Sequence, residues 1–420
     1  MSDDILGGSI MLCSFCGKSR KEVKKIITGL NVLTNICNEC VDLCHEILEN
    51  DKKREDEIDK KVSEEEFHEM PTPHEIKDLL DQTVIGQYNA KKVLSVAVYN
   101  HYKRIADIKV AGNSSKLKKS NILLIGPTGS GKTLLAQTLA EILNVPIAIA
   151  DATSLTEAGY VGEDVEGILS RLLVAAGNSV KAAERGIVYI DEIDKIALKS
   201  GRMGNTRDVS GEGVQQGLLK ILEGTVANVP KGSKPKATRE TVRMDTSNIL
   251  FICGGAFVGL EEFVTKRIDG NKSVGFGSRS EENNKNKNLN YTAQDLHDFG
   301  MIPELIGRIP ITANLQKLTE EMLVQILTEP KDNLVSQYEK IFAIDGTTLR
   351  FSPASLRAIA KEAIELKSGA RGLRSIIENI LLDSMYDSPT YKNISDIYVD
   401  ETCITKNMRP MYICEEPPQE

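Results

Sequence analysis

Two patterns of apolar residues alternate along the middle of the chain. Four runs are apolar at nearly every position: NILLIG (121–126), VPIAIAD (145–151), GIVYIDEID (186–194) and NILFICGG (248–255). The segments between them carry apolar residues at helical spacing. Short continuous apolar runs are typical of strands buried on both faces, and their alternation with helices indicates a parallel sheet. We therefore expect an α/β domain over residues 71–317.

The apolar pattern changes after Leu318. Strand-like runs become rare, whereas TEEMLVQILTEP (319–330), PASLRAIAKEAIEL (353–366) and RGLRSIIENILLDSMYD (371–387) show helical spacing. The sequence therefore predicts a smaller, mostly helical domain over residues 318–415.

The start of the chain differs from both of these regions. The segment 11–50 is short but contains five of the eight cysteines of the chain. The stretch DKKREDEIDKKVSEEE (51–66) carries 13 charged side chains in 16 positions, which is typical of a solvated linker and not of a packed element. We expect a small N-terminal domain over 11–50 and a charged linker over 51–70.

The composition is that of an ordinary globular protein, with 41% hydrophobic and 27% charged residues in a chain of 420. The formal net charge of −8 disfavours nonspecific binding to nucleic acid or to an anionic membrane. No run approaches the roughly 18 apolar residues of a membrane-spanning helix. The N-terminal MSDDILGGSI lacks the features of a signal or transit peptide. We therefore expect a cytoplasmic protein whose cysteines stay reduced.

The segment GPTGSGKT follows a buried strand pattern and opens a helical one, as the P-loop motif requires. Its glycines let backbone N–H groups approach phosphates, and the start of a helix favours negative charge. Lys132 would neutralise the β and γ phosphates, and Thr133 would hold Mg²⁺. A simple glycine-rich turn is disfavoured by this context, so we expect ATP or GTP to bind. The residues of this segment are Gly126, Pro127, Thr128, Gly129, Ser130, Gly131, Lys132 and Thr133.

Two adjacent carboxylates end the apolar run IVYIDEID. Unpaired buried acids are costly, so a structural role explains this pair poorly. Asp191 would lie beside the metal, and Glu192 would act as the general base that orients the attacking water. Hydrolysis of the nucleotide is therefore expected.

Phosphoryl transfer also needs positive charge besides Lys132. Arg308 lies in MIPELIGRIP before an expected fifth strand, and Arg371 lies in SGARGLR at the start of a helical pattern. On the residues alone, an ordinary surface or ion-paired arginine is the favoured interpretation of each. Spacing does not decide between these interpretations.

The N-terminal cysteines follow the pattern C-x₂-C-x₂₀-C-x₂-C, at Cys13, Cys16, Cys37 and Cys40. Two such pairs complete a tetrahedral Zn²⁺ site, and four protein ligands make that zinc structural. Cys44 and His45 lie close enough in sequence to replace one ligand, but the symmetry of the two pairs favours the first four.

Several further motifs occur in a fixed order around the P-loop: CSFCGKS, VIGQ, EAGYVGEDVE, TRDVSGEGVQQ, IPELIGRIP and SGARGLRS. Together they resemble the ClpX family, the AAA+ unfoldase subunits of the Clp protease, over about residues 11–415. The P-loop alone would indicate only a nucleotide-binding protein. The resemblance implies an ATPase that unfolds tagged substrate proteins, has no peptidase activity of its own and delivers them to the ClpP peptidase.

The resemblance also implies roles for particular residues. The family forms a ring of six subunits around an axial pore, and Tyr160 and Val161 match the loop that grips the polypeptide. Arg308 matches an arginine that reaches a neighbour's nucleotide, and Arg371 matches a sensor in the small domain. Residues 199–208 match a second pore loop.

Three more segments have counterparts in the family. Val84 and Ile85 match residues near the adenine, and the zinc domain matches one that dimerises and captures adaptor proteins. In SVGFGS (273–278), Val274, Gly275 and Phe276 match the tripeptide that docks on ClpP.

The chain departs from the family pattern at three places. The two cysteine pairs are spaced slightly further apart, and the basic loop at the pore entrance reads KGSKPKATRE (231–240). No polar residue suited to a first sensor ends the run NILFICGG, so that role is left unassigned.

Other classes of protein remain as alternatives. A nucleic-acid motor would use the zinc domain and the basic KSRKEVKK (18–25), but the net charge and the absence of Trp disfavour it. The related HslU family lacks such a zinc domain. A self-contained protease is disfavoured because the chain has only five His and no G-x-S-x-G segment.

Overall fold

The structure is a computed structural model, and it describes residues 12–29, 34–47, 49, 70–111, 117–156, 163–197, 211–231, 241–270, 291–391 and 394–414. The chain divides into two compact units, each of which is described by itself. One comprises Met1–Met70 with Ala106–Ser115, and the other Pro71–Ile105 with Lys116–Glu420. Among the described residues, no helix is both long and apolar enough to cross a membrane.

The N-terminal unit contains a two-stranded antiparallel sheet, β1 (Ile26–Thr28) and β2 (Asn35–Cys37). Residues 38–47 continue directly from β2 as a helix. Its small core consists of three of the cysteines with Val23, against which Ile26 and Ile36 pack. So few apolar residues give little hydrophobic stabilisation, as expected for a fold that depends on a metal.

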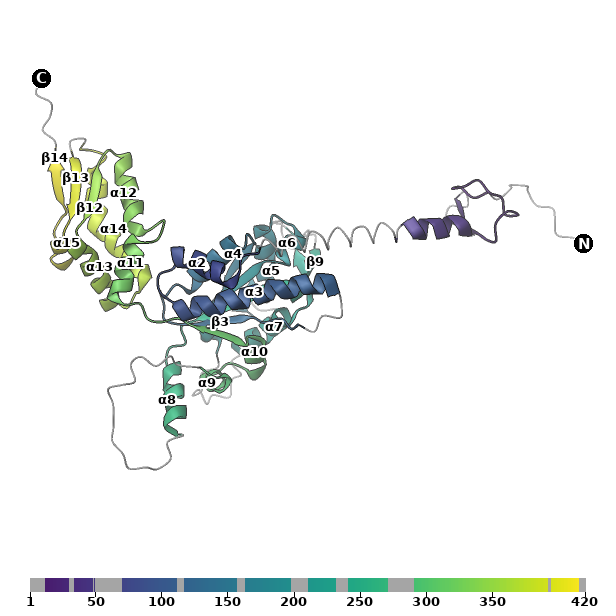
Figure 1. Cartoon of the computed structure of the whole chain (residues 1–420), viewed down its shortest axis with the longest axis horizontal. Helices are drawn as coiled ribbons and strands as arrows, with labels where there is room; N and C mark the ends of the chain where they lie inside the picture. The colour runs from purple at the N-terminus through teal and green to yellow at the C-terminus, as the bar shows by residue number, and fades with distance from the viewer. Residues whose placement is uncertain are drawn as a thin grey trace, which may run out of the picture. The chain divides into compact units, whose positions relative to one another are not determined.

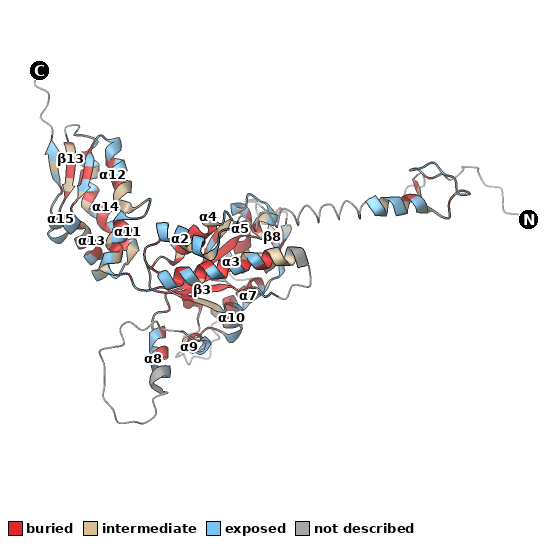
Figure 2. Ribbon diagram, in the orientation of Figure 1, coloured by how far each residue is buried: buried red, intermediate tan, exposed pale blue. Residues whose placement is uncertain are grey.

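The second unit is built around a five-stranded parallel sheet with the order β11-β3-β10-β7-β4. Every residue of β3 and β10 is buried, which requires helices on both faces of the sheet (Figures 1 and 2). The four apolar runs singled out in the sequence form four of these strands, and the α/β prediction is confirmed. The strands are β3 (Ile122–Ile125), β4 (Ile147–Asp151), β7 (Ile187–Asp191), β10 (Leu250–Gly255) and β11 (Ile311–Asn314).

The remaining elements of this α/β region surround the sheet (Figure 1). The helices are α2 (Pro73–Thr83), α3 (Tyr88–Ala111), α4 (Lys132–Ile142), α5 (Val165–Ala175), α6 (Val180–Ala183), α7 (Gly211–Glu223), α8 (Leu260–Gly270), α9 (Ala293–Phe299) and α10 (Pro303–Arg308). The short 3₁₀ helices are η2 (Ala152–Ser154), η3 (Ile193–Ile196) and η5 (Thr246–Asn248). Two small sheets pair β5 (Leu155–Thr156) with β6 (Glu163–Asp164), and β8 (Val226–Pro230) with β9 (Thr241–Asp245).

The C-terminal region has its own core, made mainly by apolar faces of helices. The predicted helical character is confirmed, but the region also contains a three-stranded sheet that the sequence did not indicate. Two of its strands, at 348–351 and 411–414, are short and largely exposed, and the third, ISDIYV at 394–399, is interrupted by polar residues, so their apolar runs were too weak to recognise. The elements are α11 (Glu320–Thr328), α12 (Leu334–Ile344), β12 (Thr348–Phe351), α13 (Pro353–Glu365), α14 (Ala370–Asp387), β13 (Ile394–Val399), α15 (Glu401–Thr405) and β14 (Met411–Cys414).

Candidate functional site

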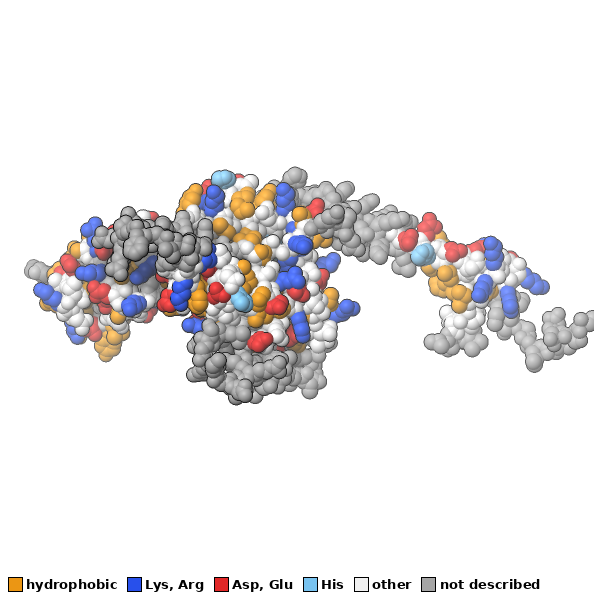
Figure 3. Space-filling model, turned by 90° about the horizontal axis from the view of Figure 1, so that it is seen from below, with side chains coloured by type: hydrophobic (Ala, Val, Ile, Leu, Met, Phe, Trp, Pro, Cys, Tyr) orange, Lys and Arg blue, Asp and Glu red, His pale blue; other side chains and the backbone are white. Residues whose placement is uncertain are grey.

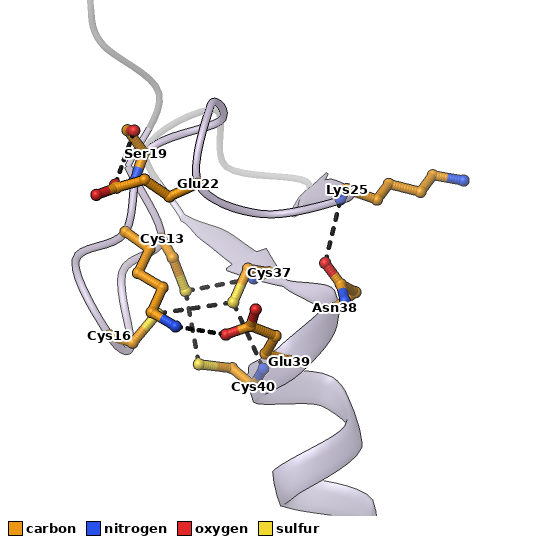
Figure 4. Close-up of polar contacts among 10 residues, drawn as sticks. Cys13, Cys16, Ser19, Glu22, Lys25, Cys37, Asn38, Glu39 and Cys40 are labelled. Atoms are coloured by element: carbon orange, nitrogen blue, oxygen red, sulfur yellow. Dashed lines mark hydrogen bonds and ion pairs between the residues drawn. The ribbon is translucent and has the colours of Figure 1, made fainter.

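Four cysteine sulfurs converge in the N-terminal unit. One pair comes from the turn that follows Leu12, and the other lies where β2 passes into the helix; Figure 4 shows their sulfurs directed toward one another. The Sγ atoms of Cys13 and Cys40 are 3.8 Å apart, and those of Cys16 and Cys37 are 3.6 Å apart. All four lie within 4.8 Å of one another.

These distances can be compared with the geometry of a zinc site. With Zn–S bonds of about 2.3 Å, a regular tetrahedron has S···S edges of roughly 3.8 Å. The two closest sulfur pairs fit this value, and backbone N–H groups also reach the sulfurs, as from Cys37 to the Sγ of Cys13 at 3.3 Å. The donor set is therefore a C4 zinc site, and Cys44 on the following helix is outside it.

The local environment affects the cysteines differently: hydrogen bonding to the Cys16 side chain and burial raise the pKa of the Cys40 thiol, whereas that of Cys13 is lowered toward the thiolate form that binds metal. Burial raises the pKa of the Cys13 thiol, but the backbone N–H groups of Cys16, Phe15 and Cys37 outweigh it and bring the pKa down to about 6. Nearby, Lys18 pairs with Glu39 at 2.6 Å, an exposed ion pair that joins the two halves of the module (Figure 4). Exposed pairs of this kind contribute little stability, so a zinc ion held by the four sulfurs would be the main link between the two cysteine pairs.

The P-loop lies between the end of β3 and the start of α4, as the sequence predicts. Gly131, the N-cap of α4, has φ +99°, a left-handed conformation that suits glycine. At Lys132, the Nζ donates to the carbonyl oxygens of Gly126 and Pro127 at 2.7 and 3.0 Å. Burial lowers the pKa of Lys132, and the Asp191 carboxylate partly offsets this effect.

The two predicted carboxylates stand at the end of the buried strand β7, which β10 separates from β3 in the sheet. Thr133 donates from Oγ1 to Oδ2 of Asp191 at 3.0 Å, so two oxygen ligands suited to Mg²⁺ are already adjacent. Glu192 is exposed and has a left-handed backbone, with φ 55°. A non-glycine residue in this conformation costs of order 1–3 kcal/mol and is typical of functional sites. Here the conformation turns the chain sharply, directly after Asp191.

These side chains line one cavity of about 530 Å³, within the range of small-molecule sites. Arg371, at the first turn of α14, lines it together with Lys132. Its positive charge also contributes to lowering the pKa of Lys132, which places the guanidinium within electrostatic reach of the P-loop. The C-terminal region therefore completes the wall of this cavity.

Close backbone contact joins the P-loop to the C-terminal region. Gly129 has φ +75°, and a Cβ on it would lie 2.6 Å from the carbonyl oxygen of Ser368. The N–H of Ala370 donates to the Gly129 carbonyl at 3.3 Å. Only glycine fits this approach, so any change in the P-loop backbone is transmitted directly to the start of α14.

The VIGQ segment lies on the other side of the P-loop. Val84 is buried near Gly131, whereas Ile85 is half buried, and neither is among the residues that line the described cavity. Gln87 is the member of this segment that the sequence analysis missed. Its Nε2 donates to the carbonyls of Gln316 at 2.8 Å and Ser130 at 3.4 Å, and its Oε1 accepts from the Gln316 N–H at 2.7 Å.

Arg308 lies at the end of α10 and does not line the cavity of its own chain. Its guanidinium pairs with Glu223 at 2.7 Å, and both side chains are about half exposed. The structure therefore brings Lys132, Asp191, Glu192 and Arg371 together and leaves Arg308 apart from them.

Other residues that the sequence did not single out also contribute to the cavity. Asp194 lines it and is buried, and its Oδ1 accepts the N–H of Ala256 at 3.1 Å. At the end of β10, Ala256 and Val258 line the cavity without polar side chains, so the first-sensor position stays unassigned. The third acidic residue in DEID (191–194) was the available signal for Asp194.

Several predicted residues lie outside the described part of the chain. They are Tyr160, Val161, Val274, Gly275 and Phe276, together with residues 199–208, most of the loop at 231–240 and nearly all of the charged linker. Their roles remain predictions.

Three family models match successive parts of the chain. The ClpX C4-type zinc finger matches residues 12–50, the AAA domain (Cdc48 subfamily) matches 117–312, and the C-terminal, D2-small domain, of ClpB protein matches 318–399. With the parallel sheet and the P-loop cavity, the second match defines the class: an AAA domain, which indicates an ATPase.

The three matches also narrow the class further. Their order, with the C4 zinc site first, matches a ClpX-like AAA+ unfoldase. The zinc finger and AAA domain together support a Clp-type AAA+ chaperone.

Replacement of Cys37 by Ser should lower zinc affinity by more than about 100-fold, because even changes beyond the ligands cost 10–100-fold. Zinc content after dialysis against a competing chelator measures this effect. Cys44→Ser is the matched control, since Cys44 lies in the same module but outside the cluster. Equal zinc retention in the two variants would contradict the assigned ligand set.

Glu192→Gln should leave ATP binding nearly unchanged but lower turnover by about 10²–10⁴-fold, because the amide cannot accept the proton of the attacking water. Nucleotide titration and steady-state ATPase assays separate the two effects. Glu141→Gln, an exposed change near the end of α4, is the control and should hydrolyse ATP normally. Near-normal hydrolysis by Glu192→Gln would rule out the general-base assignment.

Proposed function

We propose that the chain is an ATP-driven protein unfoldase that threads substrates through the pore of a homohexamer and delivers them to the ClpP peptidase. The observation that carries the proposal is the cavity itself, which joins the P-loop of the α/β region to Arg371 of the C-terminal region. Binding and hydrolysis at such a site change contacts on both sides at once. They can therefore drive motion of one region against the other.

Two further contacts support this coupling. Ala370 binds the P-loop backbone directly, and Gln87 links Ser130 to Gln316, where the chain leaves β11 toward the C-terminal region. The segment that connects the two regions is thus held by the same loop that would bind phosphate. We propose ATP with Mg²⁺ as the nucleotide, with Thr133 and Asp191 toward the metal.

Arg308 supports an assembly of several copies. Its side chain is half exposed, ion-paired with Glu223 and separate from the cavity of its own chain. In the proposed ring it acts on the nucleotide of the adjacent subunit, where an arginine of this type contributes about 10³–10⁵ in turnover.

The proposed partners follow from this activity and from the family. They are protein substrates with unstructured tags, the ClpP peptidase, and adaptor proteins bound through the zinc domain, all in the cytoplasm. The zinc domain supplies exposed apolar side chains for such contacts, among them Phe15 and Leu43.

A nucleic-acid motor is the alternative from a different class. A nucleic-acid site needs basic residues gathered on one face. On the face drawn in Figure 3, basic and acidic side chains are interspersed among the described residues. Among the described residues of the α/β and C-terminal regions, this face therefore carries no extended basic surface of the kind that a nucleic-acid motor needs.

Tyr160→Ala should preserve ATPase activity within about twofold and abolish the unfolding of a stable tagged protein, because the ring of Tyr160 is proposed to grip the polypeptide. Tyr160→Phe keeps an aromatic ring and is the control, which should still unfold the substrate. Loss of fluorescence from a tagged stable protein measures unfolding. Normal unfolding by Tyr160→Ala would remove the loop from the proposed mechanism.

Phe276→Ala should leave ATPase activity and unfolding near normal but reduce degradation by added ClpP by at least about tenfold, as expected for a buried aromatic anchor present in several copies. Ser273→Ala in the same segment is the control and should support degradation. If Phe276→Ala loses unfolding and keeps degradation of an already unfolded substrate, the segment serves the motor and not the docking.

A further inference from the structure

Gln215 has no assigned role, although it is fully buried in α7 and its amide binds two other elements. Its Nε2 donates to the carbonyl of Ile196 at 2.9 Å, and its Oε1 accepts the N–H of Ile302 at 2.9 Å. A longer contact of 3.5 Å joins Nε2 to the carbonyl of Gly300. The neighbouring Gln216 is exposed, and its hydrogen bond among the described residues stays within α7, to Glu212.

The two elements joined by Gln215 belong to different parts of the ATPase chemistry. Ile196 ends η3, the 3₁₀ helix that begins directly after Glu192. Ile302 is the N-cap of α10, which ends at Arg308. A single buried amide thus connects the segment that follows the general base to the helix that carries the separate arginine.

The same helix α7 also holds the far end of α10. Glu223, its last residue, pairs with the guanidinium of Arg308, and Asn121 donates from Nδ2 to the Arg308 carbonyl at 2.7 Å. At its other end, Gly211 packs so closely on η3 that a Cβ would lie 2.9 Å from the Ile196 carbonyl oxygen. The helix α10 therefore has one fixed position relative to η3, and Gln215 makes the polar link between them.

A buried amide is well suited to this task. Both of its polar ends are satisfied by backbone groups, so a shift of η3 or of α10 would leave a buried donor or acceptor unpaired. Catalytic groups must be held to within about 0.5 Å, and a misplacement of about 1 Å can cost 10²-fold in rate.

We propose that Gln215 is a positioning residue. It couples the conformation at the end of β7, where Glu192 lies, to the position of Arg308 in the same subunit. The coupling passes from Glu192 through η3 to Gln215, and from Gln215 to α10. It rests on the proposed function, in which Arg308 serves the adjacent subunit. Through Gln215, a conformational change at the nucleotide site of one subunit would then alter the position of the arginine that acts on the nucleotide of the adjacent subunit.

The first test compares Gln215→Met with Gln216→Met in the full-length protein. Both changes replace an amide by an apolar chain of similar length in the same turn of α7, but only the first removes the links to Ile196 and Ile302. We expect Gln215→Met to lower kcat about tenfold with nucleotide affinity within about twofold, and Gln216→Met to behave as the unaltered protein. Equal kcat and KM in the two variants would overturn the proposal.

Gln215→Glu provides a second variant if Gln215→Met unfolds. The carboxylate keeps an oxygen that can accept the Ile302 N–H but loses the donor to Ile196. Thermal unfolding of each variant identifies loss of fold. With the fold retained, we expect kcat of Gln215→Glu to lie between those of Gln215→Met and the unaltered protein. A kcat equal to the unaltered value would contradict the link to η3.

Mixed assemblies then show in which subunit Gln215→Met lowers the ATPase activity. Glu192→Gln subunits cannot hydrolyse ATP but still present Arg308, whereas Arg308→Ala subunits keep Glu192 but present no arginine. We add Gln215→Met to one or the other kind of subunit. A loss of about tenfold when it is added to the Glu192→Gln subunits supports the coupling, and a loss confined to the Arg308→Ala subunits overturns it.

The mixture of Glu192→Gln and Arg308→Ala subunits without Gln215→Met distinguishes the role of Arg308 in the adjacent subunit from the coupling through Gln215. If it shows no ATPase activity, the role of Arg308 in the adjacent subunit is wrong, and the coupling is wrong with it. If it is active and Gln215→Met in the Glu192→Gln subunits changes nothing, the coupling alone is wrong.

Discussion

The backbone of the P-loop is enclosed by backbone on three sides, and the arrangement of the whole second unit depends on this contact. Gly126 donates to the Gly255 carbonyl at 3.2 Å, and a Cβ on it would lie 2.9 Å from the Leu315 carbonyl oxygen. Gly129 meets Ser368 in the same way. Because no side chain separates these segments, a displacement of the phosphate-binding loop acts directly on the end of β10, the exit from β11 and the start of α14.

This enclosure would allow the proposed nucleotide site to couple hydrolysis to movement of the C-terminal region. A bound nucleotide would contact a loop that is packed directly against other backbone segments. A displacement of that loop would therefore act on Leu315 and Ser368 without an intervening side-chain rearrangement. The P-loop thus contacts both the segment that leaves β11, at Leu315, and the C-terminal region, at Ser368. The buried amides of Gln87 and Gln215 extend this rigid frame to the segments around it.

The sequence predicted the features that depend on consecutive residues. The four buried strands, the P-loop, the acidic pair at 191–192 and the two cysteine pairs all have local patterns, because a strand, a tight loop or a metal knuckle is encoded in a few adjacent positions. Gln87, Asp194 and Gln215 were missed because their partners are far away in the sequence. A buried glutamine is indistinguishable from an exposed one until the fold places Ile196 and Ile302 beside it.

The order of strands in the sheet also has a consequence during synthesis. β3 is the first strand of the sheet in the chain, yet it lies between β10 and β11, so Ile122 pairs with Ile252 and Ile311. At about 5–20 residues per second, the ribosome needs roughly ten to forty seconds to make the intervening chain. Both edges of a wholly apolar strand lack partners until β10 is made, and one edge still does until β11 is made, a state prone to intermolecular pairing. The nascent protein is therefore prone to aggregation until β11, the last strand of this sheet, has been synthesised.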